Sequence, residues 1–163
     1  MQALVNLNMP GWVPAGALHY LAHTECGQPI RALARAAGCH ASTVLRQIRQ
    51  IETRRDDPLV DAALRKLGAV QHESLPDTSY KQTKERTPMA QTHTDALPDE
   101  PTLAREAMRV LRRLCETGAV LAVASEMDKA VVVRDMASGG STRTAVVAST
   151  VAQAMALKNW IAP

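Results

Sequence analysis

The sequence predicts a mainly α-helical protein with two small folded parts and a flexible linker between them. Aromatic residues make up only 2% of the 163 residues and Phe is absent, so the cores must consist of Leu, Val, Ile, Ala and Met. Apolar residues recur at helical spacing in residues 1–68, whereas residues 69–101 have almost no apolar periodicity. Residues 102–163 combine helical and strand-like patterns. We therefore expect two separate small cores.

Residues 1–68 predict four short helices. Proline is favoured at the first position of a helix, and glycine just after the last one. The third helix carries the apolar spacing of Val44, Ile48 and Ile51. The expected starts are Pro14, Pro29, about Ala41 and Asp57-Pro58, and the expected ends are Gly27, Gly38, about Arg54 and Gly68.

Residues 69–101 are rich in Thr, Gln, Asp, Glu, Ser and Pro. Such a segment buries too little apolar surface to offset the entropy lost on ordering it. We therefore predict a disordered, flexible linker over this range.

Residues 102–163 predict a small α+β segment, with a helix, a β-hairpin and a closing helix. This order resembles part of a winged-helix unit, and the chain stops just after Trp160, where a complete unit would continue. The supporting patterns are the helical stripe of Leu103, Ala107, Val110 and Leu114, the β-type runs 119–124 and 130–134, the Gly139-Gly140 turn, and Ser149 as the cap of a helix with Val151, Ala154, Leu157 and Ile161 on its stripe.

The segment from Ile30 to Ile48 fits a helix-turn-helix, in which two short helices cross at a steep angle over a tight turn. Ala34 is small where the second helix must cross the first. Gly38 follows four residues later, at the turn position that needs a positive φ. Val44 stands six residues after Gly38 and is the expected apolar anchor of the second helix. The sequence therefore predicts a helix-turn-helix domain within residues 1–68.

The outward face of this motif carries the candidate functional residues. In a helix-turn-helix the N-terminal part of the second helix enters the major groove of DNA. Arginine can bond guanine there and glutamine can bond adenine, while further basic residues hold phosphates. The alternative is an ordinary solvated helix face. The candidates for base contacts are His40, Ser42, Thr43, Arg46, Gln47, Arg49 and Gln50, and those for phosphate contacts are Arg31, Arg35, Arg54 and Arg55.

The charge distribution permits this function without requiring it. The formal net charge is +3, and an acidic strip over residues 69–101 separates two basic parts. A single helix-turn-helix binds weakly, so we expect a homodimer or a companion protein. The alternatives are a protein-interaction adaptor that keeps the helical fold without specific DNA binding, and the DNA-binding end of a recombinase or transposase, for which residues 102–163 are short and lack a suitable acidic cluster.

Other classes find little support in the sequence. There is no nucleophile-elbow motif or phosphate-binding glycine loop, so we expect no enzyme and no cofactor. Cys26, Cys39 and Cys115 match neither a disulfide framework nor a zinc finger, which favours reduced thiols and no metal. Neither a membrane span nor a secretory signal is apparent. We therefore expect a cytoplasmic, nucleoid-associated protein.

The stretch HYLAHTECGQPIRALARAAGCHASTVLRQIRQIETRRDDPLVDAAL, residues 19–64, resembles the N-terminal helix-turn-helix of alphaproteobacterial regulators of the Rhodobacter type. The segments GAVLAVASEMDKAVVVRD and VAQAMALKNWI resemble the start of their C-terminal domain. This family includes the activators of gene transfer agents, which are phage-like particles that package host DNA. The resemblance implies binding to double-stranded promoter DNA and contact with RNA polymerase or another transcription factor. Fuller members continue beyond the position of Pro163, so the resemblance implies a C-terminal half that is either truncated or completed by another chain.

Overall fold

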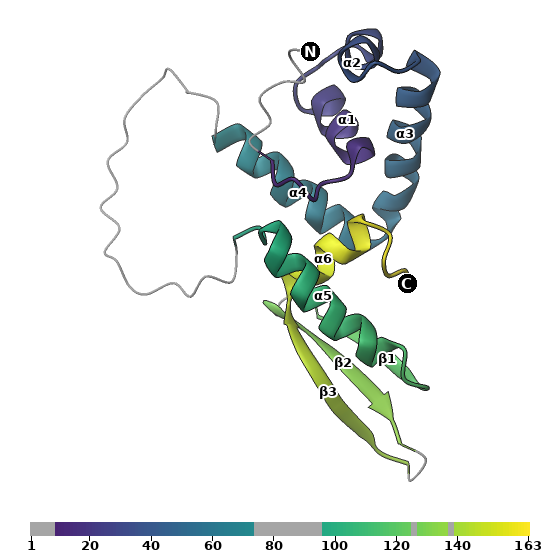
Figure 1. The fold of residues 1–163 in the computed structure, drawn as a ribbon, viewed down its shortest axis with the longest axis vertical. Coiled ribbons are helices and arrows are strands. Elements are labelled where there is room, and N and C mark those ends of the chain that lie inside the picture. Colours follow the sequence, from purple (N-terminus) through teal and green to yellow (C-terminus); the bar gives the residue numbers. More distant parts are fainter. Residues whose placement is uncertain (1–8, 74–95, 125–126, 137–138) are drawn as a thin grey trace, which may run out of the picture.

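The computed structural model describes residues 9–73, 96–124, 127–136 and 139–163. Within these ranges it has six α-helices and one three-stranded antiparallel sheet, so the fold is α+β, with a helix-rich N-terminal part and an α+β C-terminal segment as predicted (Figure 1). The elements are α1 (Ala15–Thr24), α2 (Ile30–Ala37), α3 (Ala41–Thr53), a short 3-10 turn (Arg54–Asp56), α4 (Pro58–Glu73), α5 (Glu100–Leu114), β1 (Ala119–Val123), β2 (Lys129–Asp135), β3 (Ser141–Ala148) and α6 (Ser149–Leu157).

The first three helices follow the sequence prediction closely. Pro14 and Pro29 lie at the N-caps of α1 and α2, where the missing N–H of proline costs nothing. Gly27 and Gly38 both have positive φ and lie just beyond the ends of these helices. α1 packs against α3, and α2 crosses the N-terminal end of α3 (Figure 1).

The fourth helix differs from the prediction, because α4 does not end at Gly68 but continues to Glu73. A Cβ at Gly68 would lie 3.8 Å from Glu25 Cδ and 3.9 Å from Leu21 Cδ2, at ordinary contact distance, and the backbone of Gly68 does not have positive φ, so this glycine does not end the helix. Residues 69–73 are therefore helical, and so are residues 100–101 at the start of α5. Residues 74–95 of the predicted linker lie outside the described residues.

The C-terminal sheet has the order β1-β2-β3. The predicted hairpin is confirmed as β1 and β2, with Leu121 opposite Val132. The sequence prediction does not include the third strand, β3, because it places only a loop with Gly139-Gly140 between the hairpin and the helix capped at Ser149. β3 pairs with β2 along its length, and the register shifts once, between Val132 and Val133. α5 packs against one face of this sheet (Figure 1).

The last helix is buried on all sides rather than along one stripe, and every residue of α6 is buried. Its N-cap is Ala148, and Ser149 is its first residue, whose Oγ accepts a hydrogen bond from Gln153 Nε2 at 3.2 Å. Ile161 lies beyond the C-terminal end of the helix. The predicted cap is therefore wrong, whereas three residues of the predicted stripe, Val151, Ala154 and Leu157, are buried in the helix as expected.

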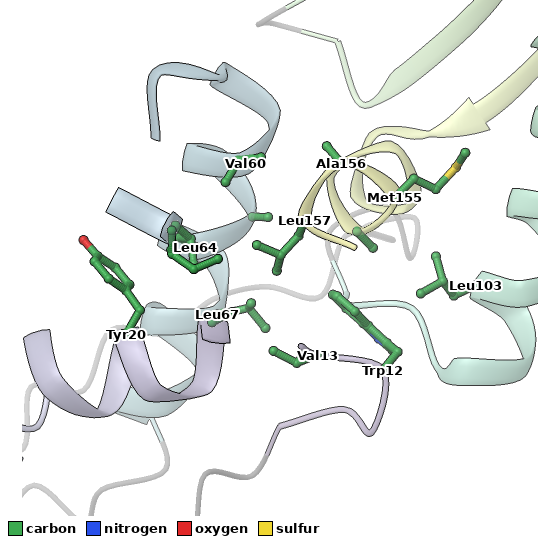
Figure 2. Close-up of a cluster of buried hydrophobic side chains, with 14 of the residues drawn as sticks. Trp12, Val13, Tyr20, Val60, Leu64, Leu67, Leu103, Met155, Ala156 and Leu157 are labelled. Atoms are coloured by element: carbon green, nitrogen blue, oxygen red, sulfur yellow. The ribbon is translucent and has the colours of Figure 1, made fainter. Parts of the chain in front are cut away.

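The sequence predicts two separate cores, but the structure has a single one. α6 packs against α4 on one side and α5 on the other, and the buried apolar residues of both parts form a single cluster. Figure 2 shows Trp12 between Leu103 of α5 and Leu157 of α6. The Trp12 indole Nε1 also donates a hydrogen bond of 2.6 Å to the carbonyl oxygen of Pro98. The segment before α1 and the segment before α5 are thus joined at the core.

Candidate nucleic-acid interface

The turn between α2 and α3 is built around Gly38. Its φ of 65° and ψ of 29° lie in the left-handed region, and its N–H bonds back to the carbonyls of Ala34 and Arg35. The N–H of Cys39 donates to Ala34 O at 3.0 Å. An added Cβ at Gly38 would meet nothing within 4 Å, so the requirement for glycine is conformational rather than steric. This is the turn that the glycine spacing predicted.

Apolar residues on the inner faces of α2 and α3 hold the two helices together. Ala34 is 4% exposed, and Leu33 and Val44 are fully buried. Ile48 and Ile51 continue the buried face of α3. The Ala34 and Val44 positions expected at the helix crossing are both in the core, which leaves the opposite faces of α2 and α3 in solvent.

The N-terminus of α3 has a histidine cap. His40 Nδ1 accepts a hydrogen bond from the Ser42 N–H at 3.4 Å and lies 2.8 Å from the Ser42 hydroxyl. Both residues are exposed, Thr43 beside them is half-buried, and the first turn of α3 holds no acidic residue. The end of the helix that carries the positive partial charge of its dipole is therefore open to an anion.

Four predicted arginines project from this unit into solvent: Arg31, Arg35, Arg46 and Arg49. None of them has an ion pair with any residue that the structure describes. Gln50 is exposed on the same helix as Arg46 and Arg49. The only carboxylate in α2 and α3 is Glu52, close to the C-terminal end of α3. The exposed face of the helix-turn-helix is thus positively charged and uncompensated.

Gln47 lies on the inner side of α3 and does not join this face. Its Oε1 accepts a hydrogen bond of 2.7 Å from Nδ1 of His19 on α1, and His19 is only 4% exposed. A glutamine that satisfies a buried histidine would leave that ring nitrogen unpaired if it turned outward to a base. We therefore remove Gln47 from the candidate interface.

Arg54 joins the two parts of the protein rather than facing solvent. Its Nη1 donates to the carbonyl oxygen of Leu157 at 3.2 Å, and its Nη2 donates to that of Ala156. These are terminal carbonyls of α6, where a cation is stabilised by the helix dipole. The same guanidinium cannot hold a phosphate without giving up these contacts, so we also remove Arg54.

Arg55 is engaged by α1 and α4. Its Nε donates to Asp61 Oδ1 at 2.8 Å, and its Nη1 donates to the Tyr20 hydroxyl at 3.0 Å. These bonds raise the pKa of Arg55, with the Asp61 hydrogen bond as the largest cause. Arg55 is the third predicted residue that we leave out, because a carboxylate already neutralises its charge.

Sequence reasoning missed the partners His19, Tyr20 and Asp61. Asp61 and Arg65 have the i,i+4 spacing of a helical ion pair, which the structure forms, so the sequence held that signal. The approach of His19 to Gln47 depends on how α1 packs across α3 and has no local sequence signature. In the described residues, no group of three or more His, Cys, Asp or Glu side chains is placed to hold a metal ion. No helix there is long and apolar enough to cross a membrane.

Comparisons of the chain with protein-family models, with curated proteins and with solved structures give no match. Any assignment therefore depends on the geometry of α2 and α3, on the charge of their exposed face and on the sequence resemblance.

Proposed function

We propose that this protein is a helix-turn-helix regulator that binds double-stranded promoter DNA through α2 and α3. The observation that carries the proposal is the exposed, unpaired arginine set across the two helices, beside a turn glycine with positive φ. Arginine on an open helix face is the residue type that reads guanine and holds phosphate. The buried Ala34 and Val44 fix the two helices in the arrangement that presents these side chains.

The residues have different roles in this proposal. Arg46 and Arg49 contact base edges in the major groove, because they lie on the exposed face of the second helix. Arg31 and Arg35 on α2 hold phosphates, which orient the domain. The remaining candidates contact either bases or phosphates; they are the exposed His40, Ser42 and Gln50 and the half-buried Thr43.

The resemblance to alphaproteobacterial regulators adds target genes, a cellular location and protein partners to the proposal. On that basis the protein is an activator of gene transfer agent or phage-like genes, acts in the cytoplasm at the nucleoid, and contacts RNA polymerase or another transcription factor. No enzymatic step or cofactor is needed for this role.

The experiment that tests DNA binding selects bound sequences from a random pool of double-stranded DNA with the full chain. A consensus is expected, and its affinity should fall steeply as salt rises, because each phosphate contact releases counterions. Absence of enrichment and of DNA affinity at low salt would overturn the proposal. Capture of a protein partner under those conditions would favour the adaptor.

A pair of matched double variants then tests the proposed face. Arg46→Ala with Arg49→Ala should lose specific binding, since each bidentate arginine–guanine contact contributes about 1–3 kcal/mol. Arg105→Ala with Arg112→Ala removes the same charge from exposed positions on α5 and should retain the specificity. Equal loss in both variants, measured by retardation of the selected fragment, would show that only net charge matters.

A further inference from the structure

The two edge strands of the sheet, β3 and β1, differ in whether other residues bond to their outward backbone groups. At the β3 edge, the carbonyl oxygen of Val146 accepts a hydrogen bond of 2.8 Å from Arg109 Nη2 on α5. At the β1 edge, the Ala119 N–H donates to the carbonyl oxygen of Glu116 at 3.1 Å, and among the described residues no comparable bond is made to Leu121 or Val123. An apolar edge strand with unpaired backbone groups is a template for pairing with another strand.

The hydrogen-bond pattern identifies which groups of β1 are unpaired. The Asp135 N–H donates to Gly118 O at 3.2 Å, so this pair is hydrogen-bonded across the β1–β2 ladder. Hydrogen-bonded and non-hydrogen-bonded pairs alternate in antiparallel strands. Leu121, opposite Val132, and Val123, opposite Ala130, are therefore non-hydrogen-bonded pairs. Their N–H and C=O groups point away from β2, and no described residue bonds to them.

The surroundings of this edge are apolar. A groove of about 580 Å³ lies along β1, and it contains one acidic residue, Asp57. No residue of 119–124 is charged, and Val120 is 60% exposed on the opposite face of the strand. The apolar walls of the groove come from α4, α5 and the C-terminal segment, and include Leu59, Leu111, Leu114, Trp160 and Ile161. An added strand would extend the sheet and cover these side chains.

We propose that the β1 edge pairs with β1 of a second copy of this chain, antiparallel and about a two-fold axis at Leu121. Each Leu121 then exchanges its N–H and C=O with Leu121 of the other copy. The N–H of Val123 donates to the carbonyl oxygen of Ala119 across the axis. Val120 lies opposite Ala122. The result is one continuous six-stranded sheet, and the same patch serves both subunits.

Self-complementarity favours a second copy over a strand from another protein. With the axis at Leu121, the two leucines face each other and every flanking pair sets an alanine opposite a valine, so a small residue meets a larger one on both sides. Because this segment has no charge, the two-fold axis brings no like charges together along it. The inference also rests on the proposed function, since one helix-turn-helix reads only a half-site and a dimer reads two.

The first measurement is the oligomeric state of the full chain by sedimentation velocity over a wide concentration range, without DNA. A concentration-dependent dimer is expected. The Leu121→Pro variant should be monomeric, because it removes an outward N–H while leaving the inward ladder to β2 intact. Circular dichroism verifies that the variant is folded. A wild-type chain that stays monomeric throughout would overturn the proposal.

A cross-linking experiment covers the case in which Leu121→Pro does not fold. It uses a background in which Cys26, Cys39 and Cys115 are replaced by serine. Leu121→Cys should form an interchain disulfide, because directly paired residues have Cα atoms about 5.5 Å apart. Ala122→Cys is the matched control; it is more exposed, but its Cα would lie about 8 Å from its counterpart. Equal or faster cross-linking at position 122 would contradict the two-fold register.

The outcome can be separated from that of DNA binding. A dimer with no affinity for DNA would leave the β1 pairing standing and overturn the proposed function. A monomer that binds a non-palindromic site would overturn the pairing and leave the DNA-binding proposal standing.

Discussion

Two arginine-bearing helices, α3 and α5, differ in whether their arginines form ion pairs with carboxylates. On α5, Arg109 lies 2.6 Å from Glu106, and Arg113 lies 2.9 Å from Glu116. Arg113 and Arg134 hold the pKa of Glu116 below its ordinary value, with Arg113 as the larger cause. Arg46 and Arg49 on α3 have no such partner among the described residues. Of the α5 arginines, only Arg112 also lacks an ion pair among the described residues. The placement of carboxylates, rather than the number of arginines, therefore decides how much unpaired positive charge a helix face carries.

The two parts that carry these helices also share one core, which the first prediction tests. Leu157→Ala should lower the free energy of unfolding by about 2–5 kcal/mol, because Leu157 is 1% exposed between the two parts. Both parts should still unfold in one transition. Urea titration followed by far-ultraviolet circular dichroism and tryptophan fluorescence measures this, and separated transitions would show two independent units.

The second prediction concerns the turn that sets α3 against α2. Gly38→Ala should lower the free energy of unfolding by about 1–2 kcal/mol, since the residue keeps a left-handed backbone. Gly140→Ala is the control; its Cβ would meet nothing within 4 Å and its φ is not positive. Thermal melting of both variants gives the comparison, and equal losses would argue against a conformational role for Gly38.

A third variant tests whether neighbouring carboxylates are the reason why most arginines of α5 are paired and those of α3 are not. Glu106→Gln with Glu116→Gln should free the α5 arginines and raise non-specific DNA affinity several-fold. The salt dependence should steepen by roughly one unit of slope for each additional phosphate that an arginine neutralises. Fluorescence anisotropy with a random duplex measures both. An unchanged slope would mean that the arginines of α5 stay inaccessible for another reason.

The smallest expected effect is that of the ion pair around Asp61. Arg55, and then Arg65, lower the pKa of Asp61 through hydrogen bonds. Because the folded-state pKa is lowered, the stabilisation is present above the unfolded-state pKa and is lost as pH falls through the folded-state value. The carboxylate and guanidinium are partly exposed, so the stabilisation is below about 1 kcal/mol. Wild-type protein should exceed Asp61→Asn in stability at neutral pH, and the difference should close in acid; a constant difference would contradict this.

Local patterns predicted the helices and the turn that carry the candidate site, but not which of its side chains are held by other parts of the fold. Proline and glycine positions predicted α1 to α3 and the turn, because these residues act on their own backbone. They did not show that Gln47 faces His19, or that Arg54 and Arg55 are engaged by α6 and Asp61. Each of those contacts joins elements that are separated in sequence. Helical periodicity describes only one helix at a time, so it predicts these three polar side chains to be exposed to solvent.

The sequence by itself determined where the first helices begin and end, the glycine turn between α2 and α3, and the β1–β2 hairpin, since all of these depend on residues close along the chain. Only the tertiary structure decided that β3 completes the sheet, that α4 passes Gly68, and that α6 lies buried between the two parts. The physical reason is the same in each case. A strand partner, a helix–helix contact and a shared core draw their free energy from residues far away in sequence, which no local pattern records.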